Sequence, residues 1–173
     1  SGGDFRGESL EGADFREAQL DGADFSNARL AGADFSEASL INASFEDADL
    51  TGATLAHADL SSARLTGAVL READLSGAVL VEANLPHADL AGCVMTWVQL
   101  DHADLTQATL TKAHLEQADI SGGDLTRADL REVVLDFAIL DGAILTQADL
   151  HQARANQDSA SEDSCSLHEN ITG

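Results

Sequence analysis

Aspartate recurs in this chain at positions that lie twenty residues apart. The pairs are Asp4 and Asp24, Asp14 and Asp34, Asp104 and Asp124, and Asp129 and Asp149. If the chain winds into coils of twenty residues, the two carboxylates of a pair become vertical neighbours, which either repel one another or share a hard divalent cation. No glycine-rich calcium repeat accompanies them. We therefore expect acidic ladders on a surface, with no metal and no cofactor.

A second set of residues is apolar where other repeats are polar. It consists of Val94, Trp97, Val134 and Phe137. On coils of twenty residues all four would share one side, two coils apart, with His114 and Gln117 between them. Aligned aromatic side chains on an otherwise acidic surface indicate a contact patch. We predict an interface here with a partner or a second copy of the chain, the alternative being simple covering by the tail or a lateral neighbour.

Residues suited to catalysis are scarce. The six histidines occur singly, and the sequence has no phosphate-binding glycine loop, no nucleophile elbow and no zinc-ligand spacing. The sequence therefore predicts a protein that is not an enzyme.

A period of five residues determines where all these side chains lie. Every fifth residue from Phe5 to Leu150 is Leu, Phe, Met or Ile, and the position two residues earlier is Ala throughout, with six exceptions. The exceptions are Gly3, Glu8, Cys93, Val98, Gly123 and Val133. Neither a helix nor a flat strand keeps such a period on one face, so the chain must turn once per repeat, with these two positions pointing inward. Glu8 is expected in a solvated first coil.

The number of sides follows from longer spacings. From Phe5 to Phe45 the central residue alternates between Phe and Leu, so that Phe recurs every ten residues, and glycines at 12, 32, 52 and 92 repeat at multiples of twenty. Four sides per coil is the simplest solution, with parallel pairing between stacked coils. About 7.5 coils would then form a rod on the order of 36 Å long. Around residues 91–100, Met95 and Val98 replace the usual Leu and Ala, and we expect the coil to swell there.

The repeat unit A-(D/N)-L-x-x resembles that of the pentapeptide-repeat family, in its small cyanobacterial-type members. It is seen as ADLTG at 48–52, ADLSG at 73–77 and ANLPH at 83–87. The resemblance covers residues 1–155 and implies an all-β fold, a right-handed quadrilateral parallel β-helix. Residues 156–173 lose the pattern and are predicted to be a polar tail that caps the last coil through Leu167 and Ile171, or is mobile.

The net charge of −22 bears on the partner. It argues against direct binding of nucleic acid or membrane and favours a basic protein partner. We predict a rigid acidic interaction scaffold. The resemblance implies an alternative, a DNA mimic that binds a type II topoisomerase such as DNA gyrase. Homo-oligomers through end or lateral contacts are a further expectation. The simplest interpretation of the acidic side chains is that they only keep the protein soluble.

Cysteine content and hydropathy bear on the compartment. Cys93 and Cys165 are too few for a disulfide framework, and no apolar run reaches the length of a membrane-spanning helix. We expect a cytoplasmic protein in which Cys93 is a buried apolar residue.

Overall fold

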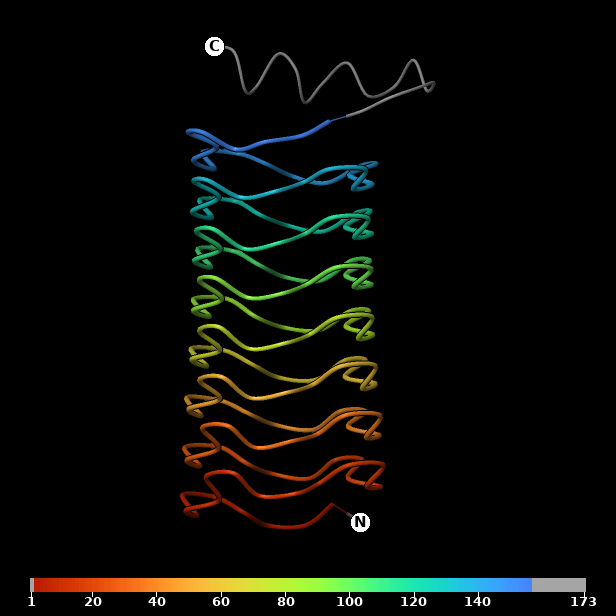
Figure 1. The fold of residues 1–173 in the computed structure, drawn as a ribbon, viewed down its shortest axis with the longest axis vertical. Coiled ribbons are helices and arrows are strands. Elements are labelled where there is room, and N and C mark those ends of the chain that lie inside the picture. The colour runs from red at the N-terminus through yellow and green to blue at the C-terminus, as the bar shows by residue number, and fades with distance from the viewer. Residues whose placement is uncertain (1, 157–173) are drawn as a thin grey trace.

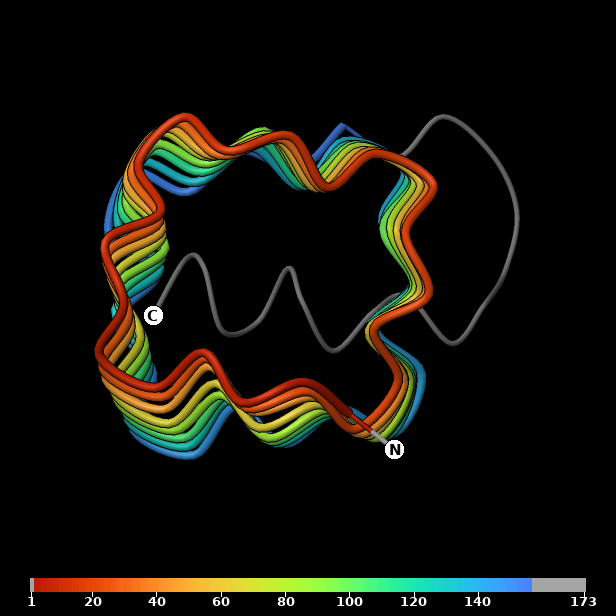
Figure 2. The same cartoon turned by 90° about the horizontal axis from the view of Figure 1, so that it is seen from below.

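The computed structural model describes residues 2–156 as a stack of similar coils (Figure 1). Parallel bridges join residues twenty apart along the whole stack, from Asp4 with Asp24 to Val134 with Arg154. Twenty residues per coil and five per repeat give four sides, and the view along the axis has a four-sided outline (Figure 2). The predicted tail, including Leu167, Ile171 and Cys165, lies outside the described residues apart from Asn156.

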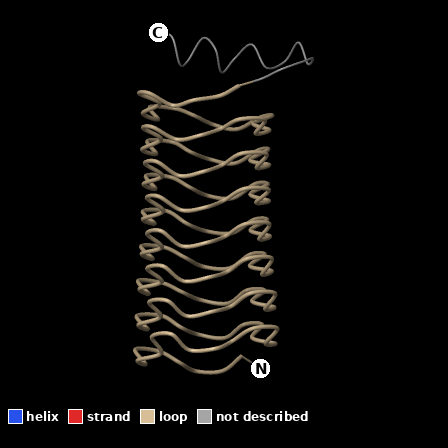
Figure 3. Ribbon diagram, viewed as in Figure 1, coloured by secondary structure: helices blue, strands red, loops and turns tan. Residues whose placement is uncertain are grey.

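We name the sides A to D by their central apolar residues. Side A holds 5, 25 and every twentieth residue to 145, side B the series from 10 to 150, side C the series from 15 to 155, and side D the series from 20 to 140. Within residues 2–156 there is no continuous helix or strand, only one bridge residue per side, so the ribbon is drawn as loop throughout (Figure 3).

Hydrogen bonds between coils replace those of an extended sheet. Each repeat of the inner coils donates three such bonds, as when Leu75 N donates to Val94 O, Gly77 N to Thr96 O and Asp74 N to Ala53 O, at 2.7–2.9 Å. A fourth bond closes the turn, from Ala78 N to Leu75 O at 3.0 Å. The backbone groups are thus paired from coil to coil, as a parallel ladder requires.

All thirty turns between residues 7 and 152 have the same conformation. The second of the two residues that link consecutive sides has a φ between +54° and +70°, whether it is one of ten glycines or one of twenty other residues. Positive φ at this place is the mark of a type II turn. The chain is therefore bent the same way at every corner, which keeps the coils in register.

The core has the composition that the period predicts. Phe25, Leu30 and the equivalent residues through Leu135 are at most 2% exposed, with small Ala side chains between them. The coils at either end are more open, and Phe5 and Leu145 are only partly buried against the core. Glu8 is exposed in the first coil, as predicted.

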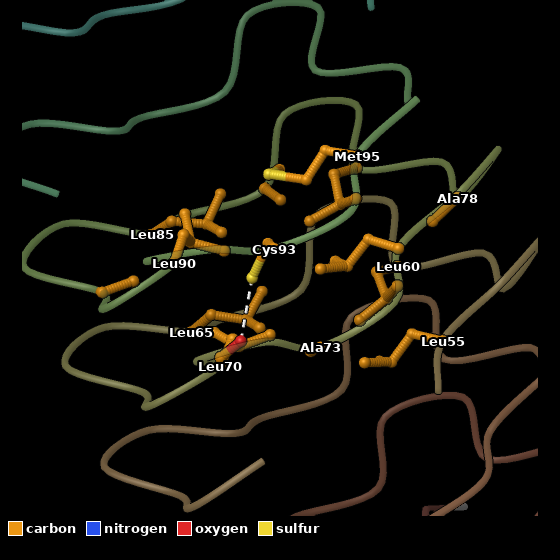
Figure 4. Packing of buried hydrophobic residues seen from close by; sticks show 14 of the residues in the cluster. Leu55, Leu60, Leu65, Leu70, Ala73, Ala78, Leu85, Leu90, Cys93 and Met95 are labelled. Atoms are coloured by element: carbon orange, nitrogen blue, oxygen red, sulfur yellow. Dashed lines mark hydrogen bonds between the residues drawn. The ribbon is translucent and has the colours of Figure 1, made fainter. Parts of the chain in front are cut away.

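The larger inward residues Cys93, Val98 and Val133 lengthen the hydrogen bond of the turn that each of them ends. Turn bonds elsewhere measure 2.9–3.1 Å, but those donated by Cys93, Val98 and Val133 measure 3.2, 3.3 and 3.3 Å. All three side chains are fully buried. Cys93 Sγ lies 2.8 Å from the carbonyl oxygen of Leu70 in the coil below (Figure 4). The register is nevertheless kept, because Val94 still bridges His114.

Candidate protein-binding surface

Most of the aspartates have a local role in the turns. An Asp that precedes the central apolar residue accepts the backbone N–H two residues later, as Asp59 does from Ser61 at 3.0 Å and Asp119 from Ser121 at 3.0 Å. The same bond is made by Asp4, Asp14, Asp24, Asp34, Asp49, Asp74, Asp89, Asp104, Asp124, Asp129 and Asp149. Aspartate is favoured here because its short carboxylate reaches its own turn.

Arginine neutralises three of the four predicted ladders. The bridges place all four aspartate pairs side by side. Arg16 lies 2.7 Å from Asp14 and 3.8 Å from Asp34. Arg6 sits in the same way between Asp4 and Asp24, and Arg131 between Asp129 and Asp149. Only Asp104 and Asp124 lack such an arginine among the described residues. Repulsion within the ladders is thus largely relieved without a metal.

The ion pairs also shift the acidity of the aspartates. Side-chain hydrogen bonds from Arg16 hold the pKa of Asp14 at about 2, and those from Arg6 do the same for Asp4. For Asp24, the hydroxyl and backbone N–H of Ser26 lower the pKa. These carboxylates therefore stay charged well below their usual range.

The corner between sides C and D carries the exposed aromatic side chains. This C/D corner consists of residues 17, 37, 57, 77, 97, 117 and 137, the turn positions that end side C. Trp97 is 61% exposed and Phe137 52%, and both have positive φ, 57° and 62°. A bulky residue in this conformation costs roughly 1–2 kcal/mol relative to a normal backbone. Trp97 and Phe137 thus combine an unfavourable backbone with exposed apolar surface, which is the kind of local conflict found at functional sites.

The indole N–H of Trp97 already donates a hydrogen bond within the protein. It donates to Oε1 of Gln117, the next residue up the corner. The ring faces of Trp97 and the phenyl ring of Phe137 are therefore what this corner offers to a partner.

The other residues of the predicted patch lie on side C. Val94 is 39% exposed and Val134 is partly buried, with His114 bridged between them. Ile139 is 47% exposed on side D, two residues beyond Phe137. The predicted patch did not include Ile139, which lies next to it because the corner joins side C to side D. The sequence could have indicated this neighbour, because the first outward residue of side D, Ile139, follows the turn residue Phe137 by only two positions.

Side D differs from the other sides in charge. Its outward positions hold six acidic residues and no Lys or Arg. The acids are Asp21, Asp59, Glu82, Asp101, Asp119 and Asp141. On sides A to C, every Lys or Arg except Arg127 forms an ion pair with an acid. Side D, which borders the aromatic corner, therefore has more acidic residues without a Lys or Arg partner than any other side of the described rod.

Neither a metal-binding cluster nor a reactive cysteine is found within residues 2–156. No three His, Cys, Asp or Glu side chains there are grouped to hold a metal ion. Burial raises the pKa of the Cys93 thiol to about 12, so this cysteine is not a nucleophile. The same part of the chain contains no helix that could span a bilayer.

Comparison with known proteins identifies the repeat. A sequence model of pentapeptide repeats matches in eight copies, over residues 1–30, 18–56, 28–67, 58–96, 99–136 and 128–157. The chain belongs to the pentapeptide-repeat family. This family membership makes the coiled stack a right-handed β-helical solenoid, as the sequence predicted. A search among curated proteins found no match.

Solved structures include other pentapeptide-repeat proteins. A trypsin-treated form of QnrB1, described as a plasmid-mediated fluoroquinolone resistance protein, superposes with a TM-score of 0.70 at 22% identity, over 96% of this chain and 88% of QnrB1. HetL, a pentapeptide-repeat protein involved in heterocyst differentiation regulation in Nostoc sp. strain PCC 7120, is 31% identical over 92% of this chain and 87% of HetL, with a TM-score of 0.35. The likeness to QnrB1 supports the fold.

Proposed function

We propose that this pentapeptide-repeat protein is a non-enzymatic, rigid and acidic interaction scaffold that binds a protein partner through the C/D corner. One observation carries the proposal: Trp97 and Phe137 are exposed on the same corner, in a backbone conformation that disfavours them. A rod held by repeated hydrogen bonds keeps such side chains at a fixed separation. Two coils at about 4.8 Å each place them about 10 Å apart. We also infer that the rod has about 7.5 coils, which is what the twenty-residue register gives over 150 residues.

A paired substitution tests this surface. Trp97→Ser with Phe137→Ser should leave the thermal unfolding curve nearly unchanged, because both side chains are exposed, and should abolish partner capture and any self-association. The matched control is His87→Ser with Gln107→Ser, at equivalent turn positions on the corner diagonally opposite. Capture that survives in the Trp97 and Phe137 variant, or is lost equally in the control, would exclude the C/D corner as the binding surface.

A second candidate function is supported by the charge of the rod. Up to residue 156 there are 27 acidic and 9 basic residues, a net charge of −18. Over a rod on the order of 36 Å this is one charge per about 2 Å, compared with one per about 1.7 Å in duplex DNA. Such a rod is suited to mimic DNA in the basic groove of a type II topoisomerase such as DNA gyrase.

Inhibition of DNA gyrase supercoiling by the purified protein, titrated at two salt concentrations, tests this mimicry. Inhibition that weakens at the higher salt would favour it. No inhibition at high micromolar protein would leave the C/D corner as the binding surface to pursue. The cytoplasmic location stays a prediction from the sequence.

A further inference from the structure

The apolar surface at the C/D corner is larger than its two aromatic residues. Five large hydrophobic side chains are exposed among the described residues, and four of them lie at this corner or beside it. They are Val94, Trp97, Phe137 and Ile139, whereas the fifth, Ile144, lies on side A. Concentrated apolar exposure on an otherwise charged molecule marks an interaction surface.

The charges around this surface select the partner. Asp101, Asp119 and Asp141 follow the corner on side D in the coils of residues 97, 117 and 137, and none is within ion-pair distance of a described Lys, Arg or His. On side C, Glu116 Oε2 is covered and accepts no hydrogen bond from the described residues, while Oε1 lies 3.2 Å from His114. These carboxylates favour a cationic occupant. They disfavour a second copy of the chain, whose net charge is −22.

The spacing along the corner selects the shape of the partner. Trp97, Gln117 and Phe137 occupy three successive coils, at about 4.8 Å per coil. Residues i, i+3 or i+4, and i+7 of an α-helix lie about 5 and 10 Å apart on one face. Side chains on one face of a strand recur every 6.6–6.8 Å or so, and match neither interval. Arginine suits the exposed indole face, because its planar guanidinium stacks on aromatic rings.

We propose that the C/D corner and side D together bind a basic amphipathic helix of a partner protein, whose apolar stripe lies on Trp97 and Phe137 and whose arginines face Asp101, Asp119 and Asp141. This inference rests on the proposed interaction function and names the chemistry of the partner.

The fluorescence of Trp97 gives a direct test, because it is the only tryptophan in the chain. The probes are three synthetic helical peptides without Trp and of equal length. One has a leucine stripe flanked by arginines, one has glutamate in place of each arginine, and one has the arginine peptide's composition in scrambled order. We expect the arginine peptide alone to change the Trp97 emission in a saturable way. Binding should weaken at least tenfold with Asp101→Asn, Asp119→Asn and Asp141→Asn combined.

The matched control removes the same charge elsewhere. Asp47→Asn, Asp49→Asn and Glu72→Gln combined change three acids on sides A and B that likewise form no ion pair with a described residue, and should leave the affinity unchanged. Equal weakening in both triple variants, or equal binding of the scrambled peptide, would show attraction by total charge only and overturn the proposal. Binding of the glutamate peptide would overturn the cationic partner. If no peptide perturbs Trp97 while Trp97→Ser with Phe137→Ser still abolishes partner capture, this inference fails and the proposed function stands.

Discussion

Asp59 Oδ1 accepts the backbone N–H of Ser61 at 3.0 Å, across the start of a turn. Asp59→Ala should lower the free energy of unfolding by about 1 kcal/mol, because it leaves this donor to water. Asp59→Asn should cost less, since the amide oxygen can accept the same bond. Urea unfolding of the variants measures both effects.

The chain provides a control for this prediction. Asn84 holds the equivalent position but precedes Pro86, which has no N–H to donate. Asn84→Ala should therefore cost less than Asp59→Ala, losing only the contact with the Thr66 hydroxyl. Equal losses would contradict a turn-stabilising role for the aspartates.

The turns predict a position-specific effect of β-branched residues. None of the thirty positive-φ positions holds Val, Ile or Thr. Gln107→Val should destabilise the rod by roughly 1–2 kcal/mol, because a β-branched side chain is strained in this conformation. Gln107→Gly should stabilise it slightly, and Thr109→Val, on the neighbouring side, should be nearly neutral. Thermal unfolding of the three variants would refute the argument if Gln107→Val and Thr109→Val behaved alike.

Acid titration should reveal the ion pair of Arg16. The pKa of Asp14 lies at about 2 in the folded protein, below its ordinary value of 3.8, chiefly through hydrogen bonds from Arg16. A lowered folded pKa stabilises the protein above the unfolded value, so this contribution should be complete above about pH 4 and disappear as the pH falls towards 2. Carboxyl NMR would follow the titration. Arg16→Gln should raise the pKa of Asp14 and leave that of Asp4 at about 2, and an unchanged Asp14 would disprove the pairing.

The buried thiol of Cys93 should report on opening of the coils. Its pKa is raised to about 12 by burial, and it contacts Leu70 O. In a Cys165→Ser variant, a thiol reagent at mildly alkaline pH should modify Cys93 only under unfolding conditions. Rapid modification in native buffer would mean that the coils around Cys93 open readily.

The sequence was sufficient to predict the core and the register. A five-residue period with Ala and Leu two residues apart permits few chain paths. The longer spacings, Phe every ten residues and Gly at multiples of twenty, indicate four sides. Met95 and Val98 led us to expect a swollen coil at residues 91–100, whereas the structure shows longer turn hydrogen bonds at Cys93, Val98 and Val133.

The surface was harder to predict because its interactions cross between coils. The aspartate pairs were expected to repel, and the bridging roles of Arg6, Arg16 and Arg131 were not anticipated. Each arginine follows its aspartate by two residues, which in retrospect is a readable signal. The predicted patch left out Ile139, because sorting residues by side hides neighbours that meet across a corner.

The constant coil length has a consequence for how such a rod can change in size. Removing or adding twenty residues would shorten or lengthen the rod by one coil, and every later side chain would stay on its own side. Removing a single repeat of five would instead rotate everything beyond it by a quarter turn. A deletion of that kind between Trp97 and Phe137 would move the two aromatic side chains to different corners, with the core still filled and only the recognition geometry destroyed.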